Sequence, residues 1–385
     1  MSLKNHSLIK QINRAKILNV IRKKSPIARS QIAGEAGLDK KSITNFVNEL
    51  MREGLIEEAG KLERAAGRPF TMLQFKPHYV AGVYLAPYYV SGVLTDLYGN
   101  VVESSQERYS MFAPLEEILT AAKKVCGELS KSRRDIIGAG ICLPGILDMD
   151  TGIVLESVNI PGTKGCEFIK LFSGMFDCPV YFEEVSRAGA LAEKWFGAGQ
   201  DMKDFVCLGA SIGLGAGIVI NRQLFVGAGH YAGEVGHMVI EPGGRQCQCG
   251  NLGCLEAYAA EKRILEYLNP LLPEPVDILE EVDLSLVQQK KLDPLIEDIG
   301  SKLGQGMAAI VSIISPKYII LHGTVIEKFG DALMPYITKS MRTNCQPGCF
   351  AGTEVVFSNL KYGDALGGAA VPLSKLFEVP GHYYV

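Results

Sequence analysis

Hydrophobic residues near the start of the chain recur with the spacing of amphipathic helices. The first predicted helix covers 13–24, and the Ser25-Pro26 pair ends it because the residue before proline avoids the helical conformation. A second predicted helix covers 30–36 and stops at Gly37, which readily adopts the left-handed conformation of a helix end. The pattern therefore indicates a small helical unit at this end of the chain.

A third helix is predicted over 40–52, with Asp39 as its N-cap and apolar residues at helical spacing on its inner face. Helix, short glycine turn and helix form the helix-turn-helix pattern, whose second helix enters the major groove of DNA. Lysines at the start of that helix suit phosphates, and Ser, Thr and Asn can reach base edges. The alternative is a solvated helix face. The predicted DNA contacts on this helix are Lys40, Lys41, Ser42, Thr44, Asn45 and Asn48.

Two short strands are predicted over 55–60 and 68–75, and they would form the wing of a winged helix. Between them, Arg64 or Arg68 could enter the minor groove, where narrow A·T tracts attract arginine. A solvated loop with two charged residues explains the same segment equally well.

Beyond Lys76-Pro77 the pattern changes to short β-rich segments separated by helical ones, which predicts two α/β halves. Residues 270–292 are less regular and are expected to form a surface insertion. The predicted strands cover 79–85, 89–96, 136–143, 180–185, 205–210, 215–220, 318–322 and 355–357. The predicted helices cover 114–130, 167–176, 186–196, 255–268, 294–314, 325–341 and 364–376.

A length of 385 residues and an apolar content of 47% indicate two or three globular domains. No apolar run reaches the roughly eighteen residues needed to span a bilayer, and the polar start does not resemble a signal peptide. Ten scattered cysteines do not form a disulfide scaffold, which favours a cytoplasmic protein. Seven of them are assigned no special role: Cys126, Cys142, Cys166, Cys178, Cys207, Cys345 and Cys349.

Charge is distributed unevenly along the chain. Residues 1–76 contain 15 Lys and Arg against 7 Asp and Glu, whereas the remainder contains 24 against 35. A basic first segment joined to an acidic body indicates that the first segment meets a polyanion, and nucleic acid is the leading candidate.

The densest cluster of metal-binding residue types has the spacing His-x9-Cys-x-Cys-x4-Cys within eighteen residues. Four nitrogen and sulfur ligands suit a closed tetrahedral Zn²⁺ site, and intervening glycines let the loop fold back on one ion. Free thiols or a disulfide are the alternatives. A disulfide is disfavoured in a reducing compartment, and three unbound thiols beside a histidine would be prone to oxidation. A closed site leaves no position for hydrolytic water, so the zinc is expected to be structural. The predicted ligands are His237, Cys247, Cys249 and Cys254.

Two carboxylates accompany this cluster: Glu234 lies three residues before His237, and Glu256 lies two after Cys254. The runs Gly-Glu-Val-Gly-His from 233 and Cys-Gln-Cys-Gly-Asn-Leu-Gly-Cys-Leu-Glu from 247 resemble the zinc motif of the ROK family of sugar kinases and sugar-responsive repressors. The resemblance covers essentially the whole chain. It implies an α/β, actin-like (ribonuclease-H-like) fold of two lobes, preceded by the winged helix-turn-helix domain that ROK kinases lack.

Three domains are expected from this resemblance. Residues 1–76 would form the winged helix-turn-helix domain, and 77–198 the first α/β lobe, completed by the C-terminal helix at about 362–385. Residues 199–361 would form the second lobe with the zinc loop. Ligands of such folds lie in the cleft between the lobes.

A ROK kinase needs two phosphate-binding turns and a general base, and all three differ here. In place of Asp followed by Gly-Gly-Thr, the chain has Tyr84-Leu85-Ala86-Pro87-Tyr88-Tyr89, where proline removes a donor and tyrosines prevent close approach. Val185 replaces the aspartate base and cannot accept a proton, which leaves Glu183 or Glu184 as the only substitutes. Ile212 replaces the threonine of the second turn. Kinase activity is therefore expected to be lost.

The sugar-contacting positions of the family are better matched. Asn159 corresponds to the Asn of the family's Asn-Leu-Pro-Gly, and His237 can serve both zinc and ligand through its two nitrogens. Glu184 and Val185 replace an Asn-Asp pair, which favours a smaller or differently substituted polyol than glucose. The alternative is a cleft that binds nothing. The predicted effector contacts are Asn159, Glu184, Glu234, His237 and Glu256.

The sequence therefore predicts a sugar-responsive transcriptional repressor that acts as a homodimer or higher homo-oligomer. Its partners would be a double-stranded DNA operator and a small sugar or polyol, with no membrane. Effector binding is expected to close the lobes and change the spacing of the DNA-binding heads. Two alternatives remain: a bifunctional sugar kinase with a DNA-binding head, and a repressor controlled by a partner protein.

Overall fold

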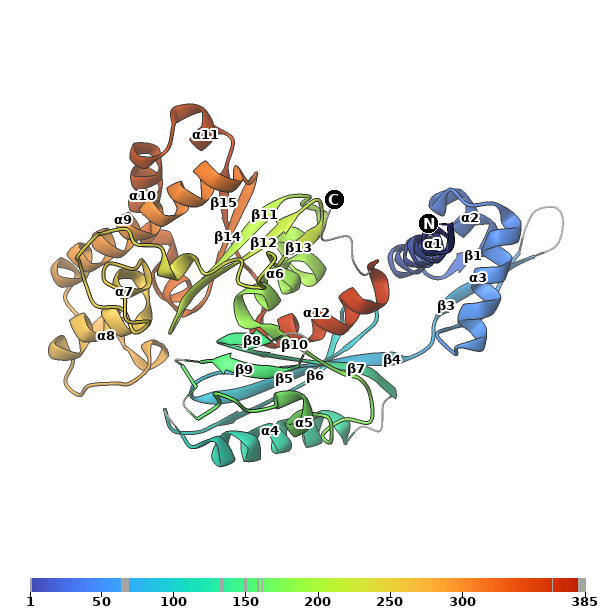
Figure 1. The fold of residues 1–385 in the computed structure, drawn as a ribbon, viewed down its shortest axis with the longest axis horizontal. Coiled ribbons are helices and arrows are strands. Elements are labelled where there is room, and N and C mark those ends of the chain that lie inside the picture. The colour runs from blue at the N-terminus through green and yellow to red at the C-terminus, as the bar shows by residue number, and fades with distance from the viewer. Residues whose placement is uncertain are drawn as a thin grey trace.

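The computed structural model describes residues 2–63, 69–111, 113–131, 135–148, 151–157, 159–160, 162–361 and 363–379. A small head lies at one end, and a body with two large sheets and their helices makes up the rest (Figure 1). No helix in the described ranges is both long enough and apolar enough to cross a bilayer.

The head contains three helices and a small antiparallel sheet in the order β1-β3-β2. Asp39 caps the third helix by accepting a hydrogen bond from the Ser42 amide (2.9 Å), and Gly37 closes the second helix with φ 65°. Apolar residues of all three helices form the core. The elements are α1 (Ser2–Lys24), β1 (Ile27–Ala28), α2 (Arg29–Ala36), α3 (Lys40–Arg52), β2 (Ile56–Leu62) and β3 (Phe70–Phe75).

The first lobe is built on a five-stranded sheet in the order β10-β7-β4-β5-β6. Strands β4, β5 and β6 form an antiparallel meander, and β7 and β10 extend the sheet in parallel. The elements are β4 (His78–Leu85), β5 (Tyr89–Asp96), β6 (Val101–Arg108), α4 (Leu115–Ser130), β7 (Asp135–Leu143), β8 (Ile146–Asp148), β9 (Ile153–Glu156), α5 (Phe168–Phe172), β10 (Val180–Glu184) and α6 (Val185–Phe196).

The second lobe repeats this topology with the strand order β13-β12-β11-β14-β15. Its first three strands are again antiparallel, and its last two are again parallel to their neighbours. The elements are β11 (Phe205–Ala210), β12 (Leu214–Ile220), β13 (Gln223–Phe225), α7 (Glu256–Ala259), α8 (Glu261–Leu268), α9 (Gln289–Ile314), β14 (Tyr318–His322), α10 (Thr324–Asn344), α11 (Pro347–Ala351) and β15 (Glu354–Phe357). A last helix, α12 (Gly363–Phe377), follows the second lobe in sequence. In the described part of the chain, 3-10 turns lie at 198–201, 235–237, 269–271, 279–281 and 284–286.

Helices α6 and α12 pack side by side between the two large sheets (Figure 1). Glycines in the first sheet permit this approach, because a Cβ on Gly82 would lie 2.1 Å from the Ala365 carbonyl oxygen. A Cβ on Gly140 would lie 2.0 Å from the Gly368 carbonyl oxygen. The last helix of the chain is therefore part of the first lobe's packing, although it follows the second lobe in sequence.

The head meets the body at the C-terminal ends of α6 and α12. The Arg22 guanidinium of α1 lies 4.4 Å from the centre of the Trp195 ring and 5.9 Å from that of Phe377. It also donates to the Trp195 carbonyl (3.3 Å), and Asn19 donates to the Phe377 carbonyl (2.8 Å). Phe75 adds an edge-on contact with the Phe377 ring. Aromatic stacking on an arginine and main-chain hydrogen bonds thus fix the angle of the head.

Several predicted helix boundaries are wrong. Helix α1 begins at Ser2 instead of 13, and α5 is shorter than predicted. The predicted helix 255–268 is two helices, because the Glu261 amide donates to the Ser211 carbonyl (2.9 Å) and not to a carbonyl one turn earlier. Helix α9 begins at Gln289, so Pro294 lies inside it and not at its start.

Residues 270–292 are not the simple surface insertion that the sequence suggests. Leu279 and Val282 are buried in the core of the second lobe, and Ile278 is also buried. The Glu280 carboxylate reaches the first lobe, where it accepts hydrogen bonds from the Tyr88 hydroxyl (3.1 Å) and the Arg108 guanidinium (3.0 Å). This segment therefore joins the two lobes across the mouth of the cleft.

Candidate metal centre and ligand cleft

The segment between β13 and α8 folds into a loop that returns to its own start. His237 lies at the end of a 3-10 turn, and isolated bridges pair Val239 with Cys254 and Gln246 with Leu252. Gly253 has φ 83°, and a Cβ there would lie 1.8 Å from the Glu241 carbonyl oxygen. Only glycine fits this crossing, which brings the third cysteine back beside the histidine.

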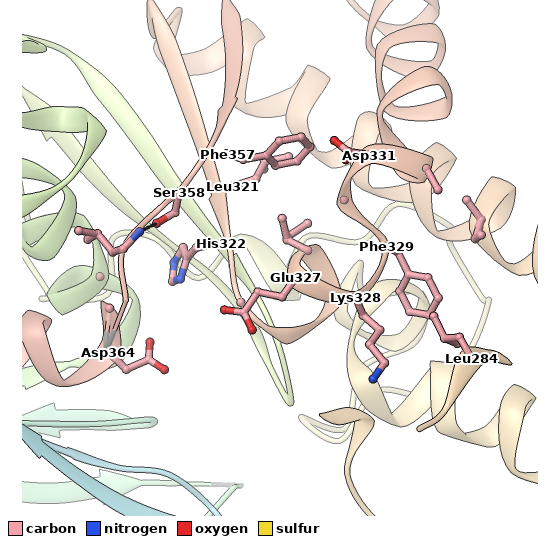
Figure 2. Close-up of a pocket in the computed structure, with 18 of the residues that line it drawn as sticks. Leu284, Leu321, His322, Glu327, Lys328, Phe329, Asp331, Phe357, Ser358 and Asp364 are labelled. Atoms are coloured by element: carbon pink, nitrogen blue, oxygen red, sulfur yellow. Dashed lines mark hydrogen bonds between the residues drawn. The ribbon is translucent and has the colours of Figure 1, made fainter. Parts of the chain in front are cut away.

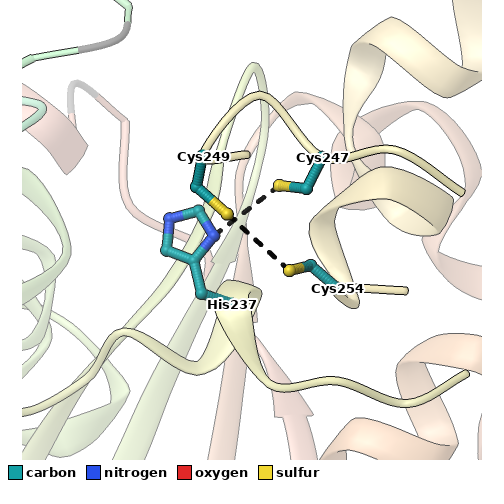
Figure 3. Close-up of side chains that lie close together, drawn as sticks. All are labelled: His237, Cys247, Cys249 and Cys254. Carbon is teal, nitrogen blue, oxygen red and sulfur yellow. Dashed lines mark hydrogen bonds between the residues drawn. The ribbon is translucent and has the colours of Figure 1, made fainter. Parts of the chain in front are cut away.

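One nitrogen and three sulfur atoms converge at this crossing (Figure 3). The ligand atoms of His237, Cys247, Cys249 and Cys254 all lie within 4.8 Å of one another. Cys247 Sγ is 3.7 Å from His237 Nδ1, and Cys249 Sγ is 3.8 Å from Cys254 Sγ. Zinc–sulfur bonds of about 2.3 Å at tetrahedral angles separate two sulfurs by about 3.8 Å. The four residues therefore fit a tetrahedral zinc ion.

The sulfur atoms are not joined by disulfides, since all ten cysteines are free thiols. Cys254 is fully buried, Cys247 nearly so, and Cys249 is exposed. Burial raises the pKa of the Cys247 thiol to about 12, and it also raises the pKa of Cys254. A divalent cation reverses this effect because it binds the thiolate form.

His237 faces two environments through its two ring nitrogens. Nδ1 points to the thiols, whereas Nε2 lies 3.9 Å from a carboxylate oxygen of Glu234. Glu256 also connects the two sides, with one oxygen 3.7 Å from Cys247 Sγ and the other accepting from the Leu214 amide (3.0 Å). The metal-competent cluster thus forms part of the wall of a neighbouring cavity.

That cavity, here called the cleft, lies between the lobes and has a volume of about 540 Å³. Its size falls in the range of small-molecule sites. The cleft is lined by residues of both lobes and of the metal-competent loop. All five residues predicted to contact an effector line it: Asn159, Glu184, Glu234, His237 and Glu256.

Glu184 lines the cleft and also caps a helix. Its carboxylate caps α6 by accepting from the amides of Ser186 (2.9 Å) and Arg187 (3.1 Å). Burial raises the pKa of Glu184, and the Arg187 charge opposes that shift. The neighbouring Glu183 points elsewhere and forms a buried ion pair with Arg187 (2.7 Å).

Sequence reasoning missed the acidic and aromatic residues at the other end of the cleft. Asp364 on α12, Glu327 on α10 and Glu280 line it together with Tyr84 and the residues that follow. Burial, with the charges of Glu327 and Glu280, raises the pKa of Asp364 to about 6. These carboxylates come from three distant segments with no common spacing, so the sequence offered no local signal for them.

A second cavity of about 680 Å³ adjoins this end of the cleft (Figure 2). His322, Gly323, Glu327 and Asp364 line both cavities. Burial lowers the pKa of His322 to about 4, and its Nε2 atom has no hydrogen-bond partner among the described residues. His322 is therefore neutral and contributes no positive charge to either cavity.

The head presents the helix that was predicted to contact DNA. On α3, Lys40, Lys41, Thr44, Asn45 and Asn48 are exposed and Ser42 is half-buried. Some of these groups already have partners: the Ser42 hydroxyl donates to Asp39, and Asn48 accepts from Arg29 (3.3 Å). Arg64 and Arg68 lie outside the described residues.

Comparison with known proteins identifies the body and then the head. Residues 81–373 match the model of the ROK family. The chain belongs to the ROK family. Residues 11–57 match a model of winged helix-turn-helix DNA-binding domains, which agrees with the α1–α3 arrangement and the small sheet.

Relatives of this ROK protein include repressors aligned over nearly the full chain. The xylose repressor of Bacillus spizizenii is 29% identical over 385 residues, covering 98% of this chain and 99% of the relative. The xylose repressor of Bacillus subtilis is 30% identical and covers 89% of this chain and 88% of the relative. The DNA-binding transcriptional dual regulator NagC of Escherichia coli is 29% identical, with coverages of 95% and 93%.

Solved structures show the same fold. A ROK family transcriptional regulator, a homologue of the Escherichia coli Mlc protein, superimposes with a TM-score of 0.80 and 26% identity, covering 96% of this chain and 97% of the other. A ROK glucokinase from Streptomyces griseus matches with a TM-score of 0.63 and 24% identity, covering 76% and 98%, which shows the fold alone. The predicted two-lobed α/β fold with a winged helix-turn-helix is confirmed.

The three positions at which the sequence is expected to depart from the ROK kinase motif all lie at the cleft. Tyr84 and Val185 line it from the first lobe, and Ile212 lines it from the turn before β12. Tyr84, Tyr88 and Tyr89 pack edge to face with ring centres 4.9–5.7 Å apart, and they fill the turn between β4 and β5.

Proposed function

We propose that this ROK protein is a DNA-binding transcriptional regulator of the repressor type, controlled by a small sugar or polyol in the cleft. The observation that carries the proposal is one chain that combines a winged helix-turn-helix head with a ligand-sized cleft and aligns end to end with xylose repressors. The assignment of the chain's functional residues to DNA, zinc and effector forms part of this proposal.

For DNA, the proposed contacts are the exposed side chains of α3, with Arg64 and Arg68 of the wing as minor-groove contacts. The basic charge of the first 76 residues supports a polyanionic partner. We place the domain boundaries after residues 76 and 198, with 362–385 returning to the first lobe, because α12 packs on the first sheet. Two heads on a homodimer would bind two half-sites of a pseudo-palindromic operator.

For the metal, His237, Cys247, Cys249 and Cys254 would hold a structural zinc ion. Zinc supplies positive charge that keeps three thiolates together and ties the loop to the wall of the cleft. This attachment fixes the directions of Glu234 and Glu256, whose carboxylates can accept hydrogen bonds from the hydroxyls of a polyol. Asn159 and the Nε2 atom of His237 would complete that side of the site.

We also propose that this chain lacks the residues needed for phosphoryl transfer. Val185 cannot accept the proton of an attacking hydroxyl. Glu184 is a poor replacement because its carboxylate already caps α6, and Glu183 is held in an ion pair with Arg187. The tyrosines of the β4–β5 turn occupy the place where a phosphate would approach the backbone.

Two helices offer a route from effector to DNA. Both α6 and α12 begin at the cleft, with Val185 and Asp364, and both end under the head, with Trp195 and Phe377. A ligand that favours one angle between the lobes would therefore change the position of the head. It shifts the DNA affinity only as far as it discriminates between the two arrangements.

Two assays on the zinc-loaded chain, run with the same compounds, distinguish a kinase from a repressor. ATP turnover is measured with a panel of monosaccharides and polyols, and binding to DNA from the gene's own upstream region is measured with the same compounds. We expect DNA binding that one of the compounds alters, and no sugar-dependent ATP turnover. Sugar-dependent turnover would contradict the loss of kinase activity, and failure to bind any DNA would contradict the regulator.

A further inference from the structure

Among the Asp, Glu, Lys and Arg residues that line the cleft, all are acidic. None of its described lining residues is lysine or arginine. The Arg187 guanidinium of α6 is bound to Glu183 (2.7 Å) and to the His230 carbonyl (2.8 Å), and it is buried. Eight carboxylates contribute to the lining: Glu156, Glu184, Glu234, Glu256, Glu261, Glu280, Glu327 and Asp364.

Two backbone donors at the glycine turn before β12 are also engaged within the protein. The Leu214 amide donates to Glu256 (3.0 Å), and the Ser211 amide donates to the Gly213 carbonyl (2.9 Å). The Thr324 amide at the start of α10 donates to the Ser211 hydroxyl (3.1 Å). Amides of this kind could otherwise bind a phosphate at a turn or helix start.

Two of the carboxylates are free to act on a ligand. Glu327 and Asp364 make no side-chain hydrogen bond or ion pair with any described residue. Both carboxylates point into the cavity that adjoins the cleft (Figure 2), and both residues also line the cleft. Burial and neighbouring negative charge raise the pKa values of both groups. The negative charges of these carboxylates and their neighbours would also repel an anionic ligand placed here.

Carboxylates and phosphates cannot complement each other without a cation or a shared proton, because both are acceptors. A hydroxyl group has a proton to donate, so a polyol can satisfy several carboxylates at once. Hydroxyl-bearing ligands therefore match this lining, and dianionic ligands do not.

We propose that the cleft selects an unphosphorylated polyol and excludes the phosphate ester of the same compound, with Glu327 and Asp364 as the excluding charges. This inference rests on the proposed function and narrows its effector class. The same two carboxylates are expected to exclude nucleotides, because the phosphates of a nucleotide are also negatively charged.

The test compares each sugar or polyol with its own phosphate ester by calorimetry on the full zinc-loaded chain. For the compound that binds, the ester should bind more weakly by on the order of 100-fold, the size expected for like charges in a partly buried site. The double variant Asp364→Asn, Glu327→Gln should reduce this ratio about tenfold. Its far-ultraviolet circular dichroism should stay unchanged, since neither carboxylate has a hydrogen-bond or ion-pair partner to lose in the described part of the chain.

Glu354→Gln is the matched control, because Glu354 is an exposed carboxylate on β15 that does not line the cleft. It removes one negative charge and should leave the ratio unchanged. An ester that binds as tightly as its parent compound would overturn the inference while leaving a sugar-controlled regulator intact. A ratio unaffected by the double variant would remove Glu327 and Asp364 as its cause. If no compound of either kind binds, the proposed function fails and this inference fails with it.

Discussion

At the residue scale, two side chains in the wall of the cleft each contact the cysteine cluster on one side and another group on the other side. His237 offers Nδ1 to the thiols and Nε2 to Glu234, and Glu256 lies between Cys247 and the Leu214 amide. These residues could be predicted from the sequence because they lie in one motif with a readable spacing. Asp364 and Glu327 could not, because only the packing of α10 and α12 brings them together.

Cys254→Ser should abolish stoichiometric zinc binding, because a hydroxyl is a poor replacement for a buried thiolate ligand. The loss should cost about 2 kcal/mol or more of unfolding free energy. Zinc content by mass spectrometry and denaturant unfolding measure both effects. Cys166→Ser, a half-buried thiol outside the loop, is the control and should keep its zinc. A Cys254→Ser protein with full zinc content would disprove the ligand set.

Asp364→Asn should stabilise the protein at neutral pH. The folded-state pKa of Asp364 is about 6, above its ordinary value of 3.8, mainly because the group is buried. Ionisation is therefore less favourable in the folded chain than in the unfolded chain. The stability that the protonated Asp364 contributes at low pH is lost as the pH rises from its ordinary pKa of 3.8 through the folded-state pKa of about 6. The variant should gain about 3 kcal/mol at pH 7.5 over the parent protein and almost nothing well below pH 4. Thermal unfolding across this range measures the difference, and a constant difference would contradict the assignment.

At the scale of elements, the second and third helices of the head followed their sequence patterns closely, whereas α1 begins well before its predicted start. Predicted helix 40–52 is α3, and its Asp39 cap forms as expected. Strand β6 was missed because its alternating exposed positions are mostly polar, as expected at a sheet edge. The break between α7 and α8 was missed because it depends on Ser211, far away in sequence.

Lys41→Ala should weaken binding to different DNA sequences to a similar extent, because an exposed lysine at the start of α3 is placed for a phosphate. The slope of log K against log salt concentration should become shallower by about 1. Lys123→Ala, an exposed lysine on α4, should change neither quantity. Unchanged affinity and slope for Lys41→Ala would place DNA on another face.

Arg22→Met should uncouple the head from the cleft. The guanidinium contacts Trp195 and Phe377 at the ends of α6 and α12, and methionine keeps the apolar stem while removing the charge and the hydrogen bond. Effector affinity should be retained, whereas the effect of the ligand on DNA affinity should shrink by about fivefold or more. Lys23→Met on the exposed side of the same helix is the control. Full coupling in Arg22→Met would exclude this contact as the route.

At the scale of the whole molecule, two lobes of the same topology enclose a cleft, and two helices lead from it to a basic head. The fold class could be predicted from the zinc motif and the alternation of strands and helices. The segment 270–292 could not, because its role depends on Tyr88 and Arg108 of the other lobe. Contacts between lobes leave no periodic pattern in either partner segment.

The central claim is that the cleft and the head are thermodynamically linked. The most direct measurement is the dissociation constant for upstream DNA, by fluorescence anisotropy at fixed salt, with and without each compound of an unphosphorylated sugar and polyol panel. We predict that one compound changes this constant by at least about fivefold, and that DNA changes the affinity for that compound by the same factor. A compound that binds the cleft with calorimetric heat but leaves the DNA constant unchanged would contradict the account.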